Sequence, residues 1–297
     1  MKTLLSTRKL KSAVVFISLL AAFLLALLLV GHIVATVTYR GLAVVASNFP
    51  RIFFDIPAVP GVREVGGVGP HLLGTALLVT IAFSIGVPIS LLAAIFTAES
   101  LKPWERKLGK MTRLMTHMLI EFPTIVVGLS VYGIMSALTP YMKTLIPGFK
   151  PFSLLSGAVA LFLVSVPYMY AQIEDGLKSI PQHVREAVYS LGAGRLLTSY
   201  ILLKYLKSTV YAALSIGLAR MVSETAALFF TAFGSDVYPL FDIQMLFRPI
   251  GSLTLAVYYF GLTGYENWVD LSWAASFILF VLSLVLFIAS RLLLRGR

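Results

Sequence analysis

The feature that most constrains this chain is a set of apolar runs, each long enough to cross the hydrocarbon core of a bilayer. A helix needs about 20 apolar residues to cross roughly 30 Å of hydrocarbon. Runs of this length occur near residues 13–37, 71–98, 118–139, 153–173, 208–232 and 273–293. We therefore expect an all-α integral membrane protein with six transmembrane helices.

The composition agrees with a membrane protein and excludes several other classes. Of the 297 residues, 58% are hydrophobic and 12% are charged, and the mean hydropathy is +0.90, which is more apolar surface than one soluble core could bury. With no cysteine and four scattered histidines, the sequence offers no disulfide framework, thiolate site or metal-ligand spacing. We expect no metal site, no catalytic residue and no cofactor in this chain.

The first apolar run follows several basic residues, as the apolar region of a signal peptide would, but it is too long for one. The apolar region of a signal peptide has roughly 7–15 residues. We interpret the run as a retained membrane anchor. Residues 1–70 then form an anchor helix with an external segment, and residues 71–297 form a core of five transmembrane helices.

The basic residues predict that both termini lie in the cytoplasm, because cytoplasmic loops of membrane proteins are enriched in Lys and Arg. Of the 24 Lys and Arg residues, 17 fall in segments that this topology places inside and six fall in outer segments, while Arg220 lies within a span. The net charge of +11 is then a topology signal of a multi-pass protein of the cell membrane. It indicates lipid surroundings and no nucleic-acid partner.

The most specific inner segment is the loop at about residues 174–207. Pro181 suits the first turn of a short helix, and Gly192 permits the turn that ends it. A second helix should start near Arg195 and lead into the fifth span. Two short helices that meet at a glycine on the cytoplasmic face would form a rigid knob suited to a partner's groove.

This loop resembles the cytoplasmic EAA motif of the permease subunits of binding-protein-dependent ABC importers. The motif reads Glu-Ala-Ala, three residues, Gly, nine residues, Ile-x-Leu-Pro. Glu186, Ala187 and Gly192 match it, while Lys204 and Tyr205 depart from its closing Leu-Pro. The resemblance implies a type I ABC-importer permease architecture.

Over most of its length the chain also resembles the A-type permeases of phosphate-specific importers. The matching pieces occur in the family's order: Gly66 to Thr75, Phe122 to Leu129, Pro167 to Pro181, Arg220 to Ala226, and Trp273 to Ala275. Members commonly carry Arg where this chain has Ala171 and Gly where it has Ser223. The resemblance implies import of inorganic phosphate, and the loss of a cation at Ala171 leaves open another oxyanion, such as sulfate, molybdate or tungstate.

The same resemblance implies partners and a mechanism. The chain would pair with a second permease and two cytosolic ABC ATPase subunits, which bind ATP and Mg²⁺, and an external phosphate-binding protein would supply the substrate. Arg185, Glu186, Ala187 and Gly192 would couple the ATPase to alternating access. The sequence contains no glycine-rich phosphate loop with Lys followed by Ser or Thr, so ATP hydrolysis would belong to another chain. We expect a translocation subunit and not an enzyme.

Arg220 and Glu224 are the ionisable residues that lie deepest in any predicted span. A spacing of four places them on one face of a helix, and a charge at mid-bilayer costs about 2.5–3.5 kcal/mol on insertion scales, so both should face a partner or a wet cavity. In the substrate-path interpretation, Arg220 donates to the oxyanion and Glu224 accepts from a protonated oxygen, with Ser223 and Thr225 beside them. In the alternative interpretation, Arg220 and Glu224 form a structural ion pair that holds helices together.

Two alternatives come from other functional classes. An ion-coupled secondary transporter is disfavoured because one span carries a clear buried charge pair and no inverted repeat is evident. A polytopic lipid-phosphate enzyme is disfavoured because no His/Asp/Ser cluster or metal-ligand spacing lies near either face.

Overall fold

The computed structural model describes residues 2–99 and 102–295, and within that part the chain is helical and forms no strand. Five helices are long and apolar enough to cross a membrane: α1 (Lys2–Ser47), α3 (Gly69–Ala98), α5 (Thr124–Leu145), α6 (Leu154–Ser179) and α12 (Glu266–Arg295). A sixth span results if α8 (Arg195–Tyr205) and α9 (Lys207–Ser223), which meet at 79°, count as one. The all-α membrane architecture is thus confirmed. Arg297, the last basic residue counted for the orientation, lies outside the described residues.

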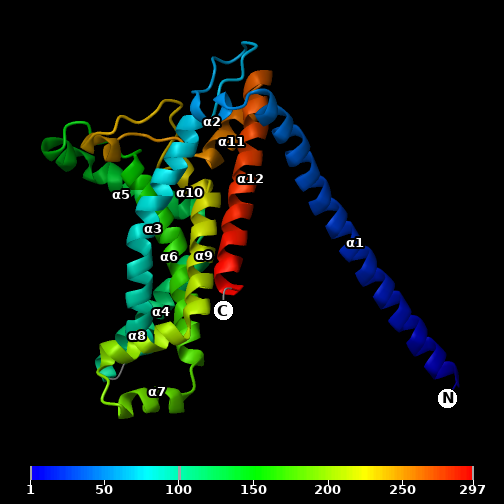
Figure 1. Ribbon diagram of the computed structural model, residues 1–297, viewed down its shortest axis with the longest axis vertical. Helices are drawn as coiled ribbons and strands as arrows, with labels where there is room; N and C mark the ends of the chain where they lie inside the picture. Colours follow the sequence, from blue (N-terminus) through cyan, green and yellow to red (C-terminus); the bar gives the residue numbers. More distant parts are fainter. Residues whose placement is uncertain (1, 100–101, 296–297) are drawn as a thin grey trace.

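The centre of the molecule is a bundle of α3, α6 and α9, with α12 packed beside α9 (Figure 1). Leu78, Leu161 and Met221, one from each of the three central helices, are almost completely buried in one cluster. Small residues allow these helices to approach closely. A Cβ atom on Gly217 of α9, for example, would lie 2.4 Å from the side chain of Met169 in α6.

Helix α1 diverges from the bundle (Figure 1). The C-terminal part of α1 packs on α12, where Val45 is buried and Gly41 lies against Phe277. The apolar side chains of residues 11–35 are exposed. They need lipid or another membrane protein around them. The division of the chain into residues 1–70 and 71–297 stays a prediction.

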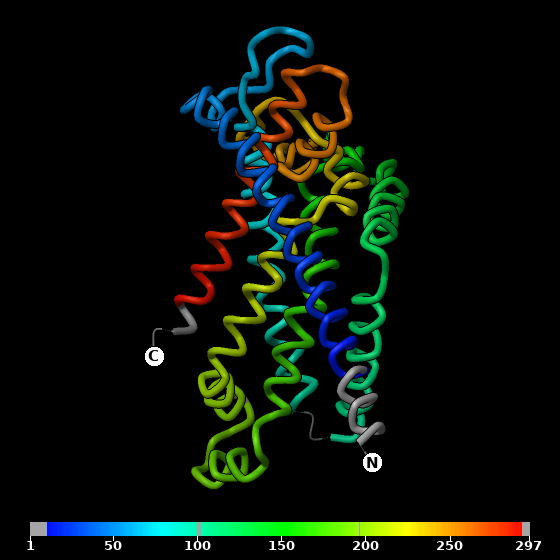
Figure 2. The backbone as a smooth tube through the Cα atoms, turned by 90° about the vertical axis from the view of Figure 1, so that its right-hand side faces the viewer, coloured from blue at the N-terminus to red at the C-terminus, as the bar shows by residue number. Residues whose placement is uncertain are grey.

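Short elements cover the two ends of the bundle. At one end lie α7 (Gln182–Ser190) and α8, and at the other lie α2 (Arg51–Phe54), the 3₁₀ helix η1 (Ile243–Phe247) and α11 (Leu253–Gly261) (Figure 1). Helix α1 toward its N-terminus and helix α12 toward its C-terminus both run toward the α7 end (Figure 2). Both ends of the chain thus approach the side of the predicted coupling loop, while the side of the membrane stays a prediction.

The predicted third span, residues 118–139, is not one continuous helix. Helix α4 (Pro103–Glu121) ends before Phe122, which is extended with φ −69° and ψ 133°, and α5 starts after Pro123. Proline disfavours the helical conformation in the residue before it and lacks the backbone N–H that a helix interior uses. The span therefore breaks at this point.

The predicted fifth span, residues 208–232, is also interrupted. Helix α9 ends at Ser223, Glu224 is extended, and a single short turn, α10 (Ala226–Phe229), follows. The Oε1 atom of Glu224 accepts a hydrogen bond from the backbone N–H of Ala227 at 3.1 Å. A side chain that satisfies a free backbone donor favours a new helix start over continuation of the old helix.

Candidate functional site

The breaks in the two spans lie against each other. Helix α10 packs on α5, and a Cβ atom on Gly128 of α5 would lie 2.6 Å from the carbonyl oxygen of Ala227 in α10. Interrupted helices inside a membrane bundle expose backbone groups that must be satisfied by protein, water or substrate. In many transporters such breaks form the substrate site. The surroundings of these breaks are therefore the candidate site.

Arg220 lies in the last turn of α9, and its guanidinium stacks on Tyr168 of α6. The Cζ atom of Arg220 is 4.6 Å from the centre of the Tyr168 ring. The Nε atom of Arg220 is buried and has no hydrogen-bond partner among the described residues. Stacking on an aromatic ring stabilises a cation but does not replace the hydrogen bonds of a buried donor. Arg220 can therefore donate to a further group.

Tyr168 is a residue of this site that sequence reasoning missed. It follows Pro167 in α6, and its hydroxyl donates a long hydrogen bond, 3.4 Å, to the carbonyl of Ile120 in the last turn of α4. The last carbonyl groups of a helix lack partners within that helix. Tyr168 thus joins Arg220 to the break between α4 and α5. An aromatic residue directly after a proline in a span was the available signal.

Glu224 lies near Arg220 in the chain but does not pair with it. Among the described residues no ion pair joins the two, and the Glu224 carboxylate instead accepts from the N–H of Ala227. The carbonyl of Glu224 accepts from Oγ1 of Thr254 in α11 at 2.8 Å. Helix α9 ends at Ser223, so Glu224 is its C-cap residue, and the shared face of Arg220 and Glu224 stays a prediction.

Ser223 and Thr225, the other two predicted path residues, point to different surroundings. Ser223 is exposed, and its hydroxyl donates to the carbonyl of Ala219 at 2.9 Å. Thr225 is half-buried and lines an apolar cavity of about 250 Å³ with Ile125 and Tyr258. The four predicted residues therefore meet at one break but do not converge on one cavity. Of the four, Arg220 is the one whose buried donor, Nε–H, has no hydrogen-bond partner among the described residues.

The predicted coupling loop forms two short helices that meet near a glycine. Glu186 and Ala187 are exposed on α7, and Gln182 donates to the Glu186 carboxylate at 2.8 Å. Gly192 follows α7 with φ +77°, and its N–H donates to the carbonyl of Tyr189 at 3.0 Å. Glycine adopts this left-handed conformation without a steric cost. The predicted shape of the loop is confirmed.

Arg185 contacts its own chain. Its guanidinium meets the carboxylate of Glu99, at the end of α3, and the carbonyl of Leu177 in α6. The side chain is 18% exposed. Arg185 therefore attaches α7 to the end of α3 and to α6, and its role in ATPase coupling stays a prediction.

The comparisons with known proteins agree with this architecture. No protein-family model matches the chain. The phosphate transport system permease protein PstA of Yersinia pestis is 32% identical over 77% of this chain and 72% of its own length. The probable phosphate transport system permease protein PstA of Methanocaldococcus jannaschii is 28% identical over 93% of this chain and 90% of its own length.

A solved structure has a similar fold. The inward-facing MetNI methionine ABC transporter contains a chain that superposes with a TM-score of 0.56 at 18% identity, covering 77% of this chain and 94% of that chain. At that identity the likeness shows the fold alone, and the fold is that of an ABC-importer permease. The curated relatives are named as permeases, which confirms a translocation subunit and not an enzyme. The chain belongs to the PstA family of phosphate transport system permease proteins.

Proposed function

We propose that this chain is the membrane-spanning subunit of an ATP-driven importer and that its substrate is inorganic phosphate. The observation that carries the proposal is the buried Nε–H of the partly buried Arg220, which has no hydrogen-bond partner among the described residues and lies beside two interrupted helices. The planar fork of arginine matches the oxygens of a tetrahedral oxyanion. One guanidinium also binds an anion less tightly than a site that surrounds it with donors. Such weaker binding suits a transport path, where the ion must leave as readily as it enters.

We further propose that a second permease chain covers the exposed side of α9 next to Arg220. Ile216, Ala219 and Ser223 are exposed and lie within one helical turn of Arg220 on α9. An arginine that faced lipid at this depth would be costly, so another protein surface should cover this side of α9. A C-type (PstC-like) permease is the proposed cover. The phosphate path would then run between the two permeases.

The remaining partners follow from the coupling loop and the family. The exposed residues Glu186 and Ala187 on α7 would sit in a groove of one of two cytosolic ABC ATPases, which bind ATP and Mg²⁺. An external phosphate-binding protein would deliver the substrate at the opposite end. ATP-driven closure of the ATPases would then move α7 and change which side of the membrane the Arg220 site faces.

Transport by the reconstituted complex should be selective for phosphate. The complex in proteoliposomes, supplied with the binding protein and internal ATP, should take up labelled phosphate. An excess of sulfate, molybdate or tungstate of about tenfold should reduce the rate little, because the proposed phosphate-binding protein selects the anion that it delivers to the permease. Stronger competition by one of the three anions than by unlabelled phosphate would reassign the substrate. Uptake driven by an ion gradient without ATP would favour a secondary transporter.

The topology gives a second prediction, which rests on the 17 inner and six outer basic residues. Single cysteines at Lys107 and Ser190 should be protected from a membrane-impermeant thiol reagent in intact cells. Cysteines at Gly61, Lys143 and Asp242 should be labelled. All five positions are exposed, and the chain has no natural cysteine, so labelling reports the side of the membrane alone. The reverse pattern would overturn the orientation and the proposed ATPase contact with it.

A further inference from the structure

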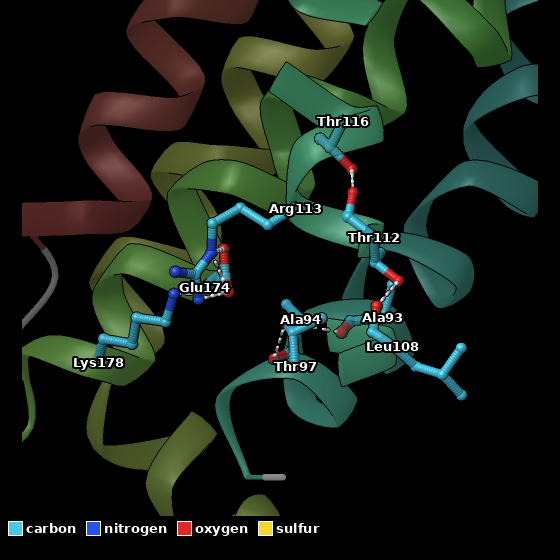
Figure 3. A network of polar contacts seen from close by, with 9 residues as sticks. All are labelled: Ala93, Ala94, Thr97, Leu108, Thr112, Arg113, Thr116, Glu174 and Lys178. Carbon is cyan, nitrogen blue, oxygen red and sulfur yellow. Dashed lines mark hydrogen bonds and ion pairs between the residues drawn. The ribbon is translucent and has the colours of Figure 1, made fainter. Parts of the chain in front are cut away.

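A buried carboxylate near the α7 end of the bundle joins α4 to α6 (Figure 3). The side chain of Glu174 in α6 is 1% exposed. It accepts hydrogen bonds from Nε of Arg113, at 3.1 Å, and from Nη2 of Arg113, at 2.6 Å, and it lies 2.7 Å from Nζ of Lys178. Arg113 belongs to α4, whereas Lys178 lies one turn along α6 itself. The contact with Arg113 therefore joins two helices, and the contact with Lys178 stays within one.

Two further buried acids tie the coupling loop to α3 and α4. Glu99 contacts Arg185 of α7, and Glu105, in the first turn of α4, lies 3.0 Å from Nη1 of Arg195, the first residue of α8. The side chains of Glu99 and Glu105 are 3% and 6% exposed. A buried carboxylate that loses its cation is strongly unfavourable. These contacts are therefore fixed connections, unlike ion pairs on an exposed surface.

The connection at Glu174 continues to the proposed substrate site. Helix α4 carries Arg113 near its middle and Ile120 in its last turn, where the carbonyl of Ile120 accepts from the hydroxyl of Tyr168. Tyr168 lies under the guanidinium of Arg220. A displacement of α4 and α6 together relative to α9, which carries Arg220, therefore changes the surroundings of Arg220.

We propose that Arg113, Glu99, Glu105 and Glu174 are positioning residues that transmit the movement of the coupling loop to the Arg220 site. The inference rests on the proposed function, because it assigns a route to the coupling that an ATP-driven importer needs. Coupling between distant sites is carried by connected networks of packed and hydrogen-bonded groups. The three acids join α3 to α7, α4 to α8 and α4 to α6. The contact of Arg185 with the carbonyl of Leu177 joins α7 to α6, so the five helices move together.

The test compares Arg113→Met with Lys178→Met in the complete complex in proteoliposomes. Each substitution removes one cation from Glu174, but only Arg113→Met removes the contact between helices. We expect Arg113→Met to lower the phosphate transported per ATP hydrolysed by at least about fivefold, the lower end of typical allosteric couplings. The complex should still assemble and hydrolyse ATP. Lys178→Met should keep the wild-type ratio.

A double variant keeps the test decisive if Arg113→Met fails to assemble. Arg113→Met with Glu174→Gln removes the contact together with the buried charge, so the protein should fold and show the same reduced ratio. A wild-type ratio in the double variant, equal losses in Arg113→Met and Lys178→Met, or no loss in either would each overturn the inference. If the wild-type complex does not accumulate phosphate on addition of ATP, the proposed function fails instead.

Discussion

Replacement of Arg220 by glutamine is expected to slow phosphate uptake roughly 10- to 150-fold while the assembled complex continues to hydrolyse ATP. A hydrogen bond to a charged group contributes about 1.5–3 kcal/mol, and each 1.36 kcal/mol corresponds to about a factor of ten. The Nε–H of Arg220 has no partner among the described residues, so its removal breaks no hydrogen bond at that atom. The measurement is the uptake of labelled phosphate into proteoliposomes, normalised to assembled complex.

Lysine at the same position should restore little of this activity. An ammonium group is a point charge on a flexible stem and cannot offer two parallel N–H groups to an oxyanion. It also stacks on an aromatic ring differently from the planar guanidinium that lies 4.6 Å from the Tyr168 ring centre. Uptake by Arg220→Lys should therefore be closer to that of Arg220→Gln than to wild type.

Glu224 supplies the matched control. Its Oε1 accepts from the N–H of Ala227, and the amide oxygen of glutamine can accept the same hydrogen bond. Glu224→Gln should therefore keep most of the uptake, and the double variant Arg220→Gln with Glu224→Gln should be as slow as Arg220→Gln alone. Near-wild-type uptake by the double variant would rule out direct contact of Arg220 with phosphate.

The long helices were predictable because hydropathy is a local property. The predicted spans 71–98 and 153–173 correspond to Gly69–Ala98 and Leu154–Ser179. The coupling loop was also predictable, since a proline that can start a helix and a glycine that can end one act through the backbone of their own segment. Gly192 occupies the left-handed turn that this reasoning assigns to it.

The breaks in the spans were harder to predict, for two different reasons. Pro123 is visible in the sequence, but the apolar run passes through it, and apolarity over a window does not report where backbone hydrogen bonds stop. The break after Ser223 has no proline. It is stabilised by contacts of Glu224 with Ala227 and with Thr254, which is 30 residues away in the sequence. Only the folded chain brings Thr254 to this point.

The buried ion pairs could not be assigned from the sequence. The partners of Glu99, Glu105 and Glu174 on other helices are 61 to 90 residues away. In the sequence each acid belongs to a short polar stretch at the end of an apolar run, where a solvated charge is the ordinary interpretation. The hydropathy pattern indicates which segments form helices. It does not indicate which acid meets which cation, because burial and pairing depend on how the helices assemble.

Substitution of Gly192 by valine is expected to abolish ATP-dependent phosphate uptake and ATPase binding while membrane insertion persists. Gly192 has φ +77°, a conformation that costs an L-residue roughly 1–2 kcal/mol and a β-branched residue more. Arg185 holds α7 against Glu99, so the strain falls on the joint between α7 and α8. The exposed residues of α7 would then face a different direction from the ATPase groove.

Gly194→Val is the matched control for Gly192→Val, because it adds the same side chain two residues away. Gly194 has φ −68°, which valine adopts readily, and a Cβ atom at either glycine would have no neighbour within 4 Å. A difference between the two variants therefore cannot come from steric crowding by the new side chain. It would come from the backbone conformation at the substituted position. We expect the ATPase to copurify with Gly194→Val and not with Gly192→Val, and phosphate uptake to follow the same order. Equal copurification and uptake in both variants would show that the turn at Gly192 does not orient α7 for its partner.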